Sequence, residues 1–589
     1  MNTEFSLRDK LKQFIISHLL KATAGNTFKY LILDDFTTSY LSHTLTMSDL
    51  VEYDIALVSK ISDSRKPSPT MEAIYFISPR ESNITSIIND AKKLRLYKKI
   101  YVFFTSEPKM NSTAPLSSCD LLHTFPSGQN FLSLNISFLA PEERFFSLPS
   151  APSLTNLVTD KPVDFEQLAN EICSVFKALE YPRPTVIYQK SSKVCKTLAD
   201  AIAKQSFEPS NVQSSILVLV DRSFDTVTPI LHGTTYRAAI FDAFEVTDHV
   251  ARFVTDGKAH ELVLQDPTDH MWKAYRDSFV YDAISSIDDD FERFRNSSEV
   301  KSMKLDADSK SSDIKKVLTG LGDFTKQSTM ICSHENAAIA LHSYFKDSTV
   351  QFHLLSALEQ DLSLGKTFDD KPVNPLENPR FNAILSSLQT PFMVKLRLML
   401  LAIHCMGGLT PETRNKFLDF VSNNRLEAAE IFNGNALIES TGGMIPNKKD
   451  KKKRRKAAID DEVDQADLKR WQPLLNELLR QVLTGEIKMN DKFVITGDLR
   501  PPGQNSSASN NIRSIRKQPK WKESDSEKPI FTTRQKPLIM IFSLGGICQY
   551  ELKPIYIPPV DGAEVIIGSD RTFTTTEYLS ILQQLGVAQ

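Results

Sequence analysis

The chain has 589 residues, of which 41% are hydrophobic and 24% are charged, and its formal net charge is −2. This composition is typical of a globular protein, and the length predicts three to four domains of about 150 residues each. The near-zero charge excludes a protein whose overall field attracts nucleic acid, so such a contact would require a local patch.

The N-terminus predicts an amphipathic helix rather than a secretory signal. The helix begins after Ser6, and its apolar face carries Leu7, Leu11, Phe14, Ile15 and Leu19. This segment lacks a continuous apolar region and a small-residue cleavage site. No apolar run in the chain reaches the roughly 18–20 residues that a membrane span requires. We therefore expect a cytosolic protein.

Three short apolar runs follow, at residues 30–35, 73–79 and 100–106. Runs that are apolar on both faces suit the central strands of a parallel sheet that is covered by helices. Residues 82–94 supply one crossover helix. We predict a small α/β domain over residues 1–138.

A second α/β domain is predicted from strands at both ends of the remaining chain. Residues 214–221 form a buried-strand run, and further runs lie at 537–546 and 563–569, ahead of a C-terminal helix. Two strands and one helix cannot form a core alone, so the last strands must join an existing sheet. We predict one discontinuous domain from residues 139–250 and 490–589.

The residues between these two parts have helical periodicity. Apolar side chains recur at steps of three and four from Trp272 to Phe291, and residues 392–406 are almost entirely apolar. We predict an inserted, mostly helical domain over residues 251–489. The fold class is therefore α/β plus α, with two parallel-sheet domains and one helical domain.

The common signatures of catalysis and of metal or nucleotide binding are absent from the sequence. No GxGxxG follows a predicted strand, and no GxSxG occurs. His334-Glu335 would open a zinc-binding HExxH helix, but the fourth position is Ala338. The six cysteines lie too far apart for a disulfide framework or a CxxC site. We expect no cofactor, no metal and no enzymatic activity.

One segment, residues 217–242, leaves two interpretations open. Asp221 follows a predicted strand, where open α/β sheets place their sites, so Asp221, Asp225 and His232 could act as metal ligands or as an acid/base set. In the structural interpretation, which we favour, Asp and Thr side chains bind local backbone and Pro229 fixes a turn. Arg222 would then bind a carboxylate of the next domain.

The same segment resembles the signature of the SM (Sec/Munc) family, which binds SNARE proteins. The matching residues are Asp221-Arg222, Asp225, Thr228-Pro229, His232, Thr235-Tyr236 and Asp242. Further resemblances follow in the same order as in the family: LILDDFTTSYL, SDSRKPSPTMEAIYFISP, ALEQDLSLG, and IFSLGG with EVIIGS. RWQPLLNELL and the LGG strand are most similar to the exocytic, plasma-membrane branch.

The resemblance implies a three-domain arch that binds a syntaxin-type SNARE, in its closed form or through its N-terminal peptide. It also implies binding of the assembled SNARE bundle or of a synaptobrevin-type SNARE. From the resemblance we further expect that no reaction is catalysed, that nucleic acid is not bound, and that the protein is a cytoplasmic monomer which reaches the plasma membrane peripherally through SNAREs.

Site residues are implied by the resemblance as well. The syntaxin-binding cleft of the first domain would comprise Asp34, Thr38, Tyr40, Leu41, Met47, Asp49, Ser59, Arg65 and Lys66. Some positions depart from the family: Ser39 and Thr46 replace basic residues, and Ser59 replaces an acidic one. Leu134 is the one residue assigned to the N-terminal-peptide pocket.

A helical hairpin tip, at about residues 300–345, would face the cleft. Relatives have a proline hinge near here, whereas this chain has Gly320 and Gly322. We hypothesise that the glycines let the hairpin switch between two forms; alternatively, they end a helix. The basic run 448–456 is either a solvated loop or a contact for anionic lipid or an acidic SNARE surface.

Two alternatives to an exocytic SM protein stay open. One is an endosomal or vacuolar SM protein in a tethering complex. The other is an α/β enzyme that uses Asp221, Asp225 and His232.

Overall fold

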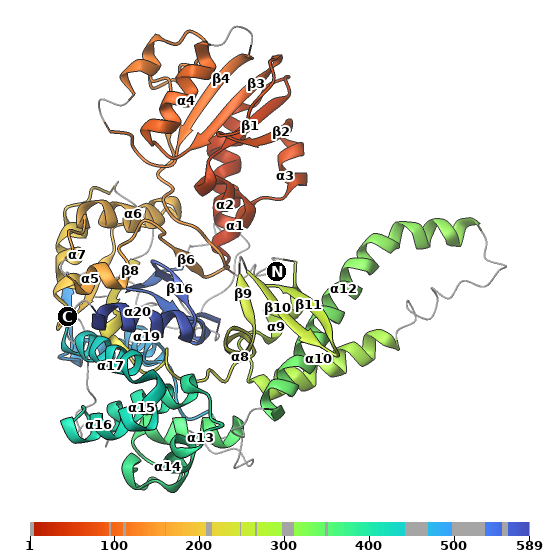
Figure 1. Ribbon diagram of the computed structural model, residues 1–589. Helices are drawn as coiled ribbons and strands as arrows, with labels where there is room; N and C mark the ends of the chain where they lie inside the picture. The colour runs from red at the N-terminus through yellow and green to blue at the C-terminus, as the bar shows by residue number, and fades with distance from the viewer. Residues whose placement is uncertain are drawn as a thin grey trace, which may run out of the picture.

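A computed structural model describes residues 5–92, 96–109, 113–159, 161–207, 215–247, 249–264, 268–296, 311–347, 352–441, 469–496, 536–556 and 563–587. Figure 1 shows an α/β domain at the top, a second α/β domain below it, and a helical region that includes a long hairpin projecting to the side. The predicted fold class is confirmed. None of the helices in these ranges is both long and apolar enough to cross a lipid bilayer.

The first domain is built on a five-stranded parallel sheet of order β2-β1-β3-β4-β5. Its strands are β1 (Lys29–Leu33), β2 (Ile55–Lys60), β3 (Ser68–Ile77), β4 (Tyr97–Phe104) and β5 (Leu132–Ser133). Its helices are α1 (Leu7–Ile15), η1 (Ile16–Leu20), η2 (Lys21–Thr23), α2 (Asp35–Thr44), α3 (Met47–Glu52), α4 (Glu81–Lys92) and η3 (Ala114–Ser118).

Both faces of this sheet are buried, as the predicted apolar runs require. Leu31 and Phe76 pack on one face with α1 and α2, whereas Ile32 and Tyr75 pack on the other with α4. The sequence prediction missed β2. This strand lies at the edge of the sheet and is largely exposed, so it lacks the buried-strand pattern.

The second sheet has six strands in the order β12-β7-β8-β13-β15-β6, with only β12 antiparallel to its neighbour. Its strands are β6 (Phe145–Ser147), β7 (Thr185–Gln189), β8 (Ser215–Asp221), β12 (Phe493–Thr496), β13 (Leu538–Leu544) and β15 (Glu564–Ser569). Strand β13 pairs with β8 from Leu538↔Ser215 to Leu544↔Asp221. The C-terminal strands therefore lie in the same sheet as residues 215–221, as the sequence predicts.

Helices cover both faces of the second sheet. Its surrounding elements are α5 (Leu154–Val158), α6 (Phe165–Ala178), α7 (Lys193–Ala203), η4 (Arg222–Phe224), α19 (Leu474–Thr484), η8 (Glu486–Met489), β14 (Ile547–Cys548), η9 (Gln549–Tyr556), β16 (Thr572–Phe573) and α20 (Thr575–Val587). Helix α19 packs on the face that carries Ile216 and Val218. It was assigned by sequence to the helical domain, so that boundary is corrected: an amphipathic helix does not reveal which core it covers.

The helical region also contains strands that the sequence prediction missed. Its elements are α8 (Tyr236–Ala243), β9 (Glu245–Thr247), β10 (Val250–Thr255), β11 (Lys258–Val263), α9 (His270–Tyr275), α10 (Val280–Arg295), α12 (Ser311–Asp347), α13 (Phe352–Leu364), η5 (Pro375–Glu377), α14 (Pro379–Ser386), α15 (Phe392–Met406), α16 (Pro411–Phe420), η6 (Ser422–Asn424) and α17 (Arg425–Ser440). Strands β9–β11 form an antiparallel sheet. The sequence signal for them was the hairpin-turn dipeptide Asp256-Gly257 between runs of alternating apolar and polar residues. In the structure both residues of this turn have positive φ.

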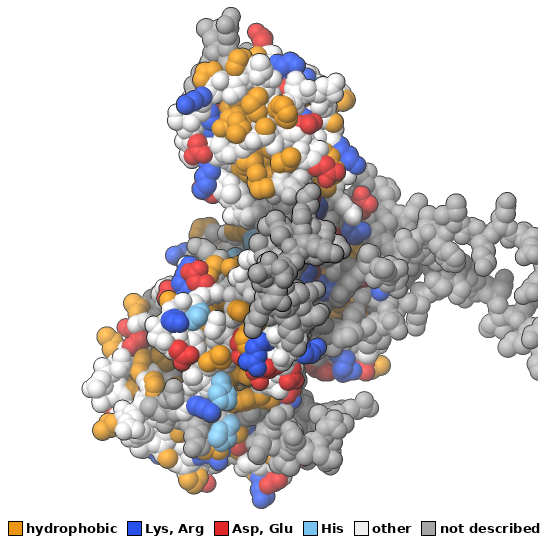
Figure 2. All heavy atoms as spheres, turned by 90° about the vertical axis from the view of Figure 1, so that its right-hand side faces the viewer, with side chains coloured by type: hydrophobic (Ala, Val, Ile, Leu, Met, Phe, Trp, Pro, Cys, Tyr) orange, Lys and Arg blue, Asp and Glu red, His pale blue; other side chains and the backbone are white. Residues whose placement is uncertain are grey.

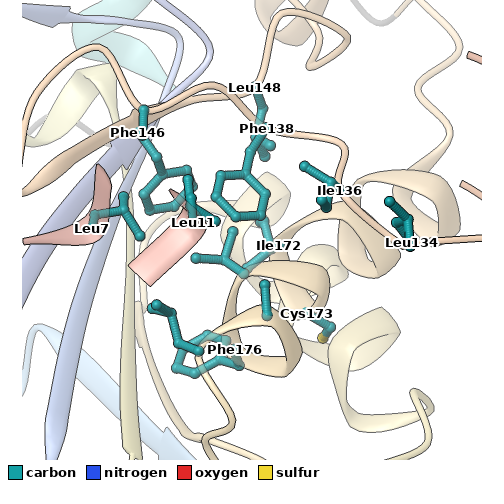
Figure 3. Close-up of a cluster of buried hydrophobic side chains, with 14 of the residues drawn as sticks. Leu7, Leu11, Leu134, Ile136, Phe138, Phe146, Leu148, Ile172, Cys173 and Phe176 are labelled. Atoms are coloured by element: carbon teal, nitrogen blue, oxygen red, sulfur yellow. The ribbon is translucent and has the colours of Figure 1, made fainter. Parts of the chain in front are cut away.

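The first domain is joined to the second by a buried segment. Residues 134–148 pack in one continuous hydrophobic core with α1 from the first domain and α6 from the second. Figure 3 shows Leu7 and Leu11 of α1 beside Phe138, Phe146 and Ile172 of this core. The two domains therefore share a core and are not separated by a free linker.

Ion pairs attach the same segment to the helical region. Arg237, fully buried, donates to Glu142, and Arg276 Nη1 lies 3.2 Å from Glu143 Oε2. Burial alone would raise the pKa of Glu143, but Arg276 and neighbouring hydrogen-bond donors lower this pKa to about 2. Glu143 is therefore charged throughout the neutral and mildly acidic range.

Two glycines allow the last helix to contact the helical region closely. A Cβ added at Gly434 of α17 would lie 1.9 Å from the carbonyl oxygen of Leu582 in α20. A Cβ at Gly586 of α20 would lie 1.8 Å from the carbonyl oxygen of Glu430 in α17. The two backbones touch, so α20 closes the second domain against the inserted region.

Gly434→Ala should destabilise the protein even though alanine has the higher helix propensity. The methyl group would collide with backbone that cannot rotate away, and we expect a loss of about 2–3 kcal/mol, the cost of overpacking. Urea denaturation measures the loss. Gly25→Ala is the matched control because nothing lies within 4 Å of its added Cβ. Equal midpoints for the two variants would contradict the close contact.

Candidate functional site

The two aspartates of the signature segment bind backbone amides of their own turns, and Asp225 also binds the distant backbone amide of Leu474. Asp221 is the N-cap of η4 and accepts a hydrogen bond from Ser223 N at 2.9 Å. Asp225 accepts from Thr228 N at 2.9 Å, from Thr228 Oγ1 at 2.6 Å and from Leu474 N at 3.0 Å. Both carboxylates stabilise turns, as the structural interpretation predicts.

Arg222 forms a buried, bidentate ion pair with Glu551. Its Nη1 and Nη2 atoms lie 2.8 and 2.6 Å from the two carboxylate oxygens, and both residues are at most 2% exposed. Burial would lower the pKa of Arg222, but Glu551 raises it above its ordinary value, so the guanidinium stays protonated. The predicted carboxylate partner exists, but it belongs to η9 of the same domain and not to the next domain.

His232 contacts α13 of the helical region, and Tyr236, the first residue of α8, contacts α12. His232 Nδ1 lies 2.8 Å from Glu359 Oε1, and the backbone amide of His232 donates to Glu359 Oε2 at 3.0 Å. The Tyr236 hydroxyl lies 3.0 Å from Nδ1 of His334, and Pro229 O accepts from Thr575 Oγ1 at 2.9 Å. The segment therefore links three elements far apart in the sequence.

These contacts favour the structural interpretation over an enzyme site. Asp221, Asp225 and His232 each bind a different partner instead of converging on one point. Within the described ranges, no group of three or more His, Cys, Asp or Glu side chains could hold a metal ion.

Four of the predicted cleft residues are buried and serve the fold of the first domain. Tyr40 is 0% exposed and Leu41 is 6% exposed, and both pack in the core beside α1. Asp34 caps α2 and accepts from Ser78 N at 2.7 Å. The side chain of Arg65 is 5% exposed, and its Nη2 lies 2.5 Å from Asp90 Oδ2. Their assignment to a partner-binding surface is corrected, because a buried side chain is not available to a partner.

Three further residues of the predicted cleft are half-buried. Thr38 Oγ1 donates to the carbonyl of Asp34 at 2.7 Å, and Ser59 lies in β2. Asp49 forms an ion pair with Lys12 at 2.7 Å and so ties α3 to α1. Burial would raise the pKa of Asp49, but Lys12 and the hydrogen bonds from Thr46 lower it below the usual value.

The exposed members mark an apolar surface that sequence reasoning only partly identified. Met47 is 64% exposed, and so are Val51 of the same helix (64%) and, in part, two residues of the edge strand, Leu57 (47%) and Val58 (39%). Successive strand residues point to opposite faces, so Leu57 and Val58 flank the two sides of the edge. We call these four residues the α3–β2 surface.

Charged side chains border this surface. Lys60 at the end of β2 forms an exposed ion pair with Asp35, and Lys66 is exposed further along the chain. Figure 2 views the molecule from the side of β2 and α3 and shows apolar side chains gathered on this face of the first domain. An apolar patch with a charged rim is typical of a protein-interaction surface.

The hairpin formed by α10 and α12 differs from the expectation about its glycines. Helix α12 is continuous from Ser311 to Asp347, so Gly320 and Gly322 lie inside the helix and do not end it. Ile339 and Tyr344 of α12 are 41% and 37% exposed. The proposed switching of the hairpin stays a prediction, and residues 297–310 of its tip lie outside the described residues.

Two other expectations concern the first domain and the basic run. Leu134 is 8% exposed and packs in the core that Figure 3 shows, so it is not an open lining residue of a peptide pocket. Residues 448–456 lie outside the described residues.

Comparison with known proteins gives a consistent result. A family model described as "Sec1 family" matches residues 29–580. The chain is 24% identical to "Protein transport protein sec1" of Dictyostelium discoideum over 612 residues, covering 98% of this chain and 99% of the relative. It is 23% identical to "SNARE-interacting protein KEULE" of Arabidopsis thaliana, covering 98% and 95% of the two chains.

Among solved structures, the fold is similar to a chain of the Unc18–syntaxin 1 complex from Monosiga brevicollis. The TM-score is 0.77 at 19% identity, and the match covers 99% of this chain and 100% of that chain. The SM protein Vps45, solved with the Qa SNARE Tlg2, has a TM-score of 0.76 at 17% identity, covering 99% and 98% of the two chains. At these identities, the comparisons establish a shared fold.

Arg222→Met should destabilise the protein strongly, because it leaves the buried carboxyl group of Glu551 without its partner. We expect a loss of about 3–5 kcal/mol, measured by urea denaturation. The double variant Arg222→Met, Glu551→Gln removes both charges and should lose less than the single variant. A double variant at least as unstable as Arg222→Met would contradict the importance of the unpaired charge.

Proposed function

The chain belongs to the Sec1 family, and from this premise we propose that it binds syntaxin-type (Qa) SNAREs and regulates or templates SNARE assembly in vesicle docking and exocytosis. The protein acts by binding and not by catalysis. The proposal divides the chain into a first α/β domain (1–138), a discontinuous second domain built on the β8–β13 sheet, and an inserted helical domain.

The names of similar proteins support a SNARE partner. One similar structure is a complex with syntaxin 1, another is a complex with the Qa SNARE Tlg2, and a similar plant protein is named SNARE-interacting. A third structure, of Sly1p, holds an N-terminal peptide of Sed5p, so we include binding of such a peptide to the first domain. Peripheral attachment to the plasma membrane would then come from the SNARE.

Sequence coverage favours the exocytic branch. The Sec1-named relatives match 95–98% of this chain, whereas a vacuolar protein sorting-associated protein 45 and a sly1 protein match only 55% and 53% of it. The structural comparisons do not separate the branches, because the two TM-scores differ by only 0.01 (0.77 against 0.76). An endosomal or vacuolar SM protein is therefore the second candidate.

The α3–β2 surface is the single observation that carries the proposal. Four large apolar side chains at one sheet edge stay in water unless a partner covers them, and burying one such side chain fully contributes about 1.5–3 kcal/mol. SNARE helices present apolar seams with charged flanks, which complement an apolar edge bordered by the Lys60–Asp35 pair and Lys66.

The contacts of the signature segment agree with a binding protein. Its acidic and imidazole groups are hydrogen-bonded to Thr228, Glu359 and local backbone. These contacts hold the second domain and the helical region together. A rigid frame of this kind positions the first domain and the α10–α12 hairpin for a partner that touches both.

Met47→Asp should weaken syntaxin binding about 10- to 100-fold, because an ionised carboxylate would have to be desolvated in the contact. Calorimetric titration with a panel of exocytic and endosomal syntaxins measures the effect and also separates the two branches. Leu388→Asp is the matched control, since Leu388 is 99% exposed in the loop between α14 and α15. Equal affinity of the Met47 variant and the control would contradict the site.

Replacing Gly320 and Gly322 together by alanine should stabilise the helical conformation of α12 by about 1 kcal/mol for each glycine and so make the helix harder to bend. If the hairpin must bend to template SNAREs, the rate of SNARE assembly in a fluorescence assay should change while syntaxin affinity stays constant. A matched control is Gly25→Ala, which lies in an open part of the first domain. An unchanged assembly rate would refute the hinge hypothesis.

A further inference from the structure

The first domain touches the β9–β11 sheet through two histidines. His43 lies in the last turn of α2, and His249 lies between β9 and β10. Their ring centroids are 5.7 Å apart, and the rings are nearly perpendicular, at 76°. His249 has a positive φ of 62°, and its carbonyl accepts from Leu264 N at 2.7 Å, so this turn is held to the chain that leaves β11.

The charged groups that act on the His43 imidazole come from two elements. Arg8 reaches it from α1 and His249 from the β9–β10 turn, and both lower the pKa of His43. Strands β1 and β3, which also pack against α2, present apolar side chains such as Leu31 and Phe76 to this helix. Both neighbouring groups therefore disfavour a proton on His43.

Arg8 cannot readily move away from this proton. Its Nε donates to the carbonyl of Ala140 at 3.1 Å, and its Nη2 donates to the carbonyl of Pro141. Both carbonyls belong to the buried segment that joins the first two domains. Burial, Arg8 and His249 together lower the pKa of His43 to about 4.

Glu143 of this segment does not change charge in the same pH range, because its pKa is about 2. Acidification between neutrality and pH about 5 thus acts on the histidine contact and leaves Glu143 ionised.

We propose that the His43–His249 contact is an acid-sensitive junction, which holds the first domain against the β9–β11 sheet at neutral pH and releases it when His43 is protonated. Because α2 and α3 are successive helices of one domain, release also moves the α3–β2 surface relative to α12. The state of the junction would then set the distance between the α3–β2 surface and α12.

The sign of the effect follows from proton linkage. In the contact the pKa of His43 is about 4; release removes His249 and part of the burial while Arg8 stays in place, so the pKa rises from this value towards the ordinary 6.5. The released form binds more protons, so its population relative to the closed form rises as pH falls. Between pH 7.5 and pH 5, this one group shifts the ratio of released to closed protein by at most about thirtyfold, the value for full recovery of the ordinary pKa.

The test measures the distance between the two bodies in the full chain. Spin labels are placed at Ser48 in α3 and Lys258 in β11, both exposed, with the partly buried Cys332 and Cys405 replaced by Ser. Double electron–electron resonance is then recorded at pH 7.5 and pH 5. The wild-type sequence should gain a longer distance at pH 5, whereas His43→Gln should keep its neutral-pH distribution.

Two further variants keep the result decisive. His18→Gln is the matched control, because His18 is exposed and stacks on Phe14 away from the junction, so it should respond like the wild type. His249→Gln removes one of the two groups that disfavour the proton on His43 and should reduce the response. A wild-type distance that does not change with pH, or a change that persists in His43→Gln, would overturn the proposal. The measurement uses no SNARE, so its outcome is independent of the proposed function.

Discussion

The position of the first domain depends on the buried segment from Leu134 to Leu148. This segment shares one hydrophobic core with α1 and α6, and its two glutamates pair with Arg237 and Arg276 of the helical region. A free linker would leave the domains to reorient, whereas a buried one transmits the orientation of each domain to the next. The surface that we assign to partner binding is held in place by this arrangement.

The second constraint is the closure of the second domain by the C-terminal strands. Strand β13 lies in the centre of the sheet beside β8, although more than 300 residues separate them, and α20 then contacts α17 through the backbone at Gly434 and Gly586. The inserted region is thereby fixed at both ends. Arg222 and Glu551 add a buried ion pair across the same closure, whose removal on one side alone is costly because the remaining charge stays buried.

In the candidate site, some residues of one short stretch stabilise the fold, whereas a neighbouring residue is exposed and available to a partner. Tyr40 and Leu41 fill the core, Asp49 ties α3 to α1, and Met47, two residues earlier, projects into water. The family resemblance placed all four on the partner surface, because resemblance compares positions along the chain and carries no information on exposure. Val51, Leu57 and Val58 were missed for the converse reason, since an apolar residue is by default expected inside.

From the sequence alone, the strand runs, the helical insertion, the discontinuous second domain and the Sec1-type signature could all be predicted. These features rest on local periodicity and on residue order, which a sequence displays directly. Only the tertiary structure decided which strand forms the edge of the first sheet, which carboxylate meets Arg222, and that His43 faces His249. Each of these depends on residues brought together from distant parts of the chain, where packing and not local pattern determines which side chains remain in water.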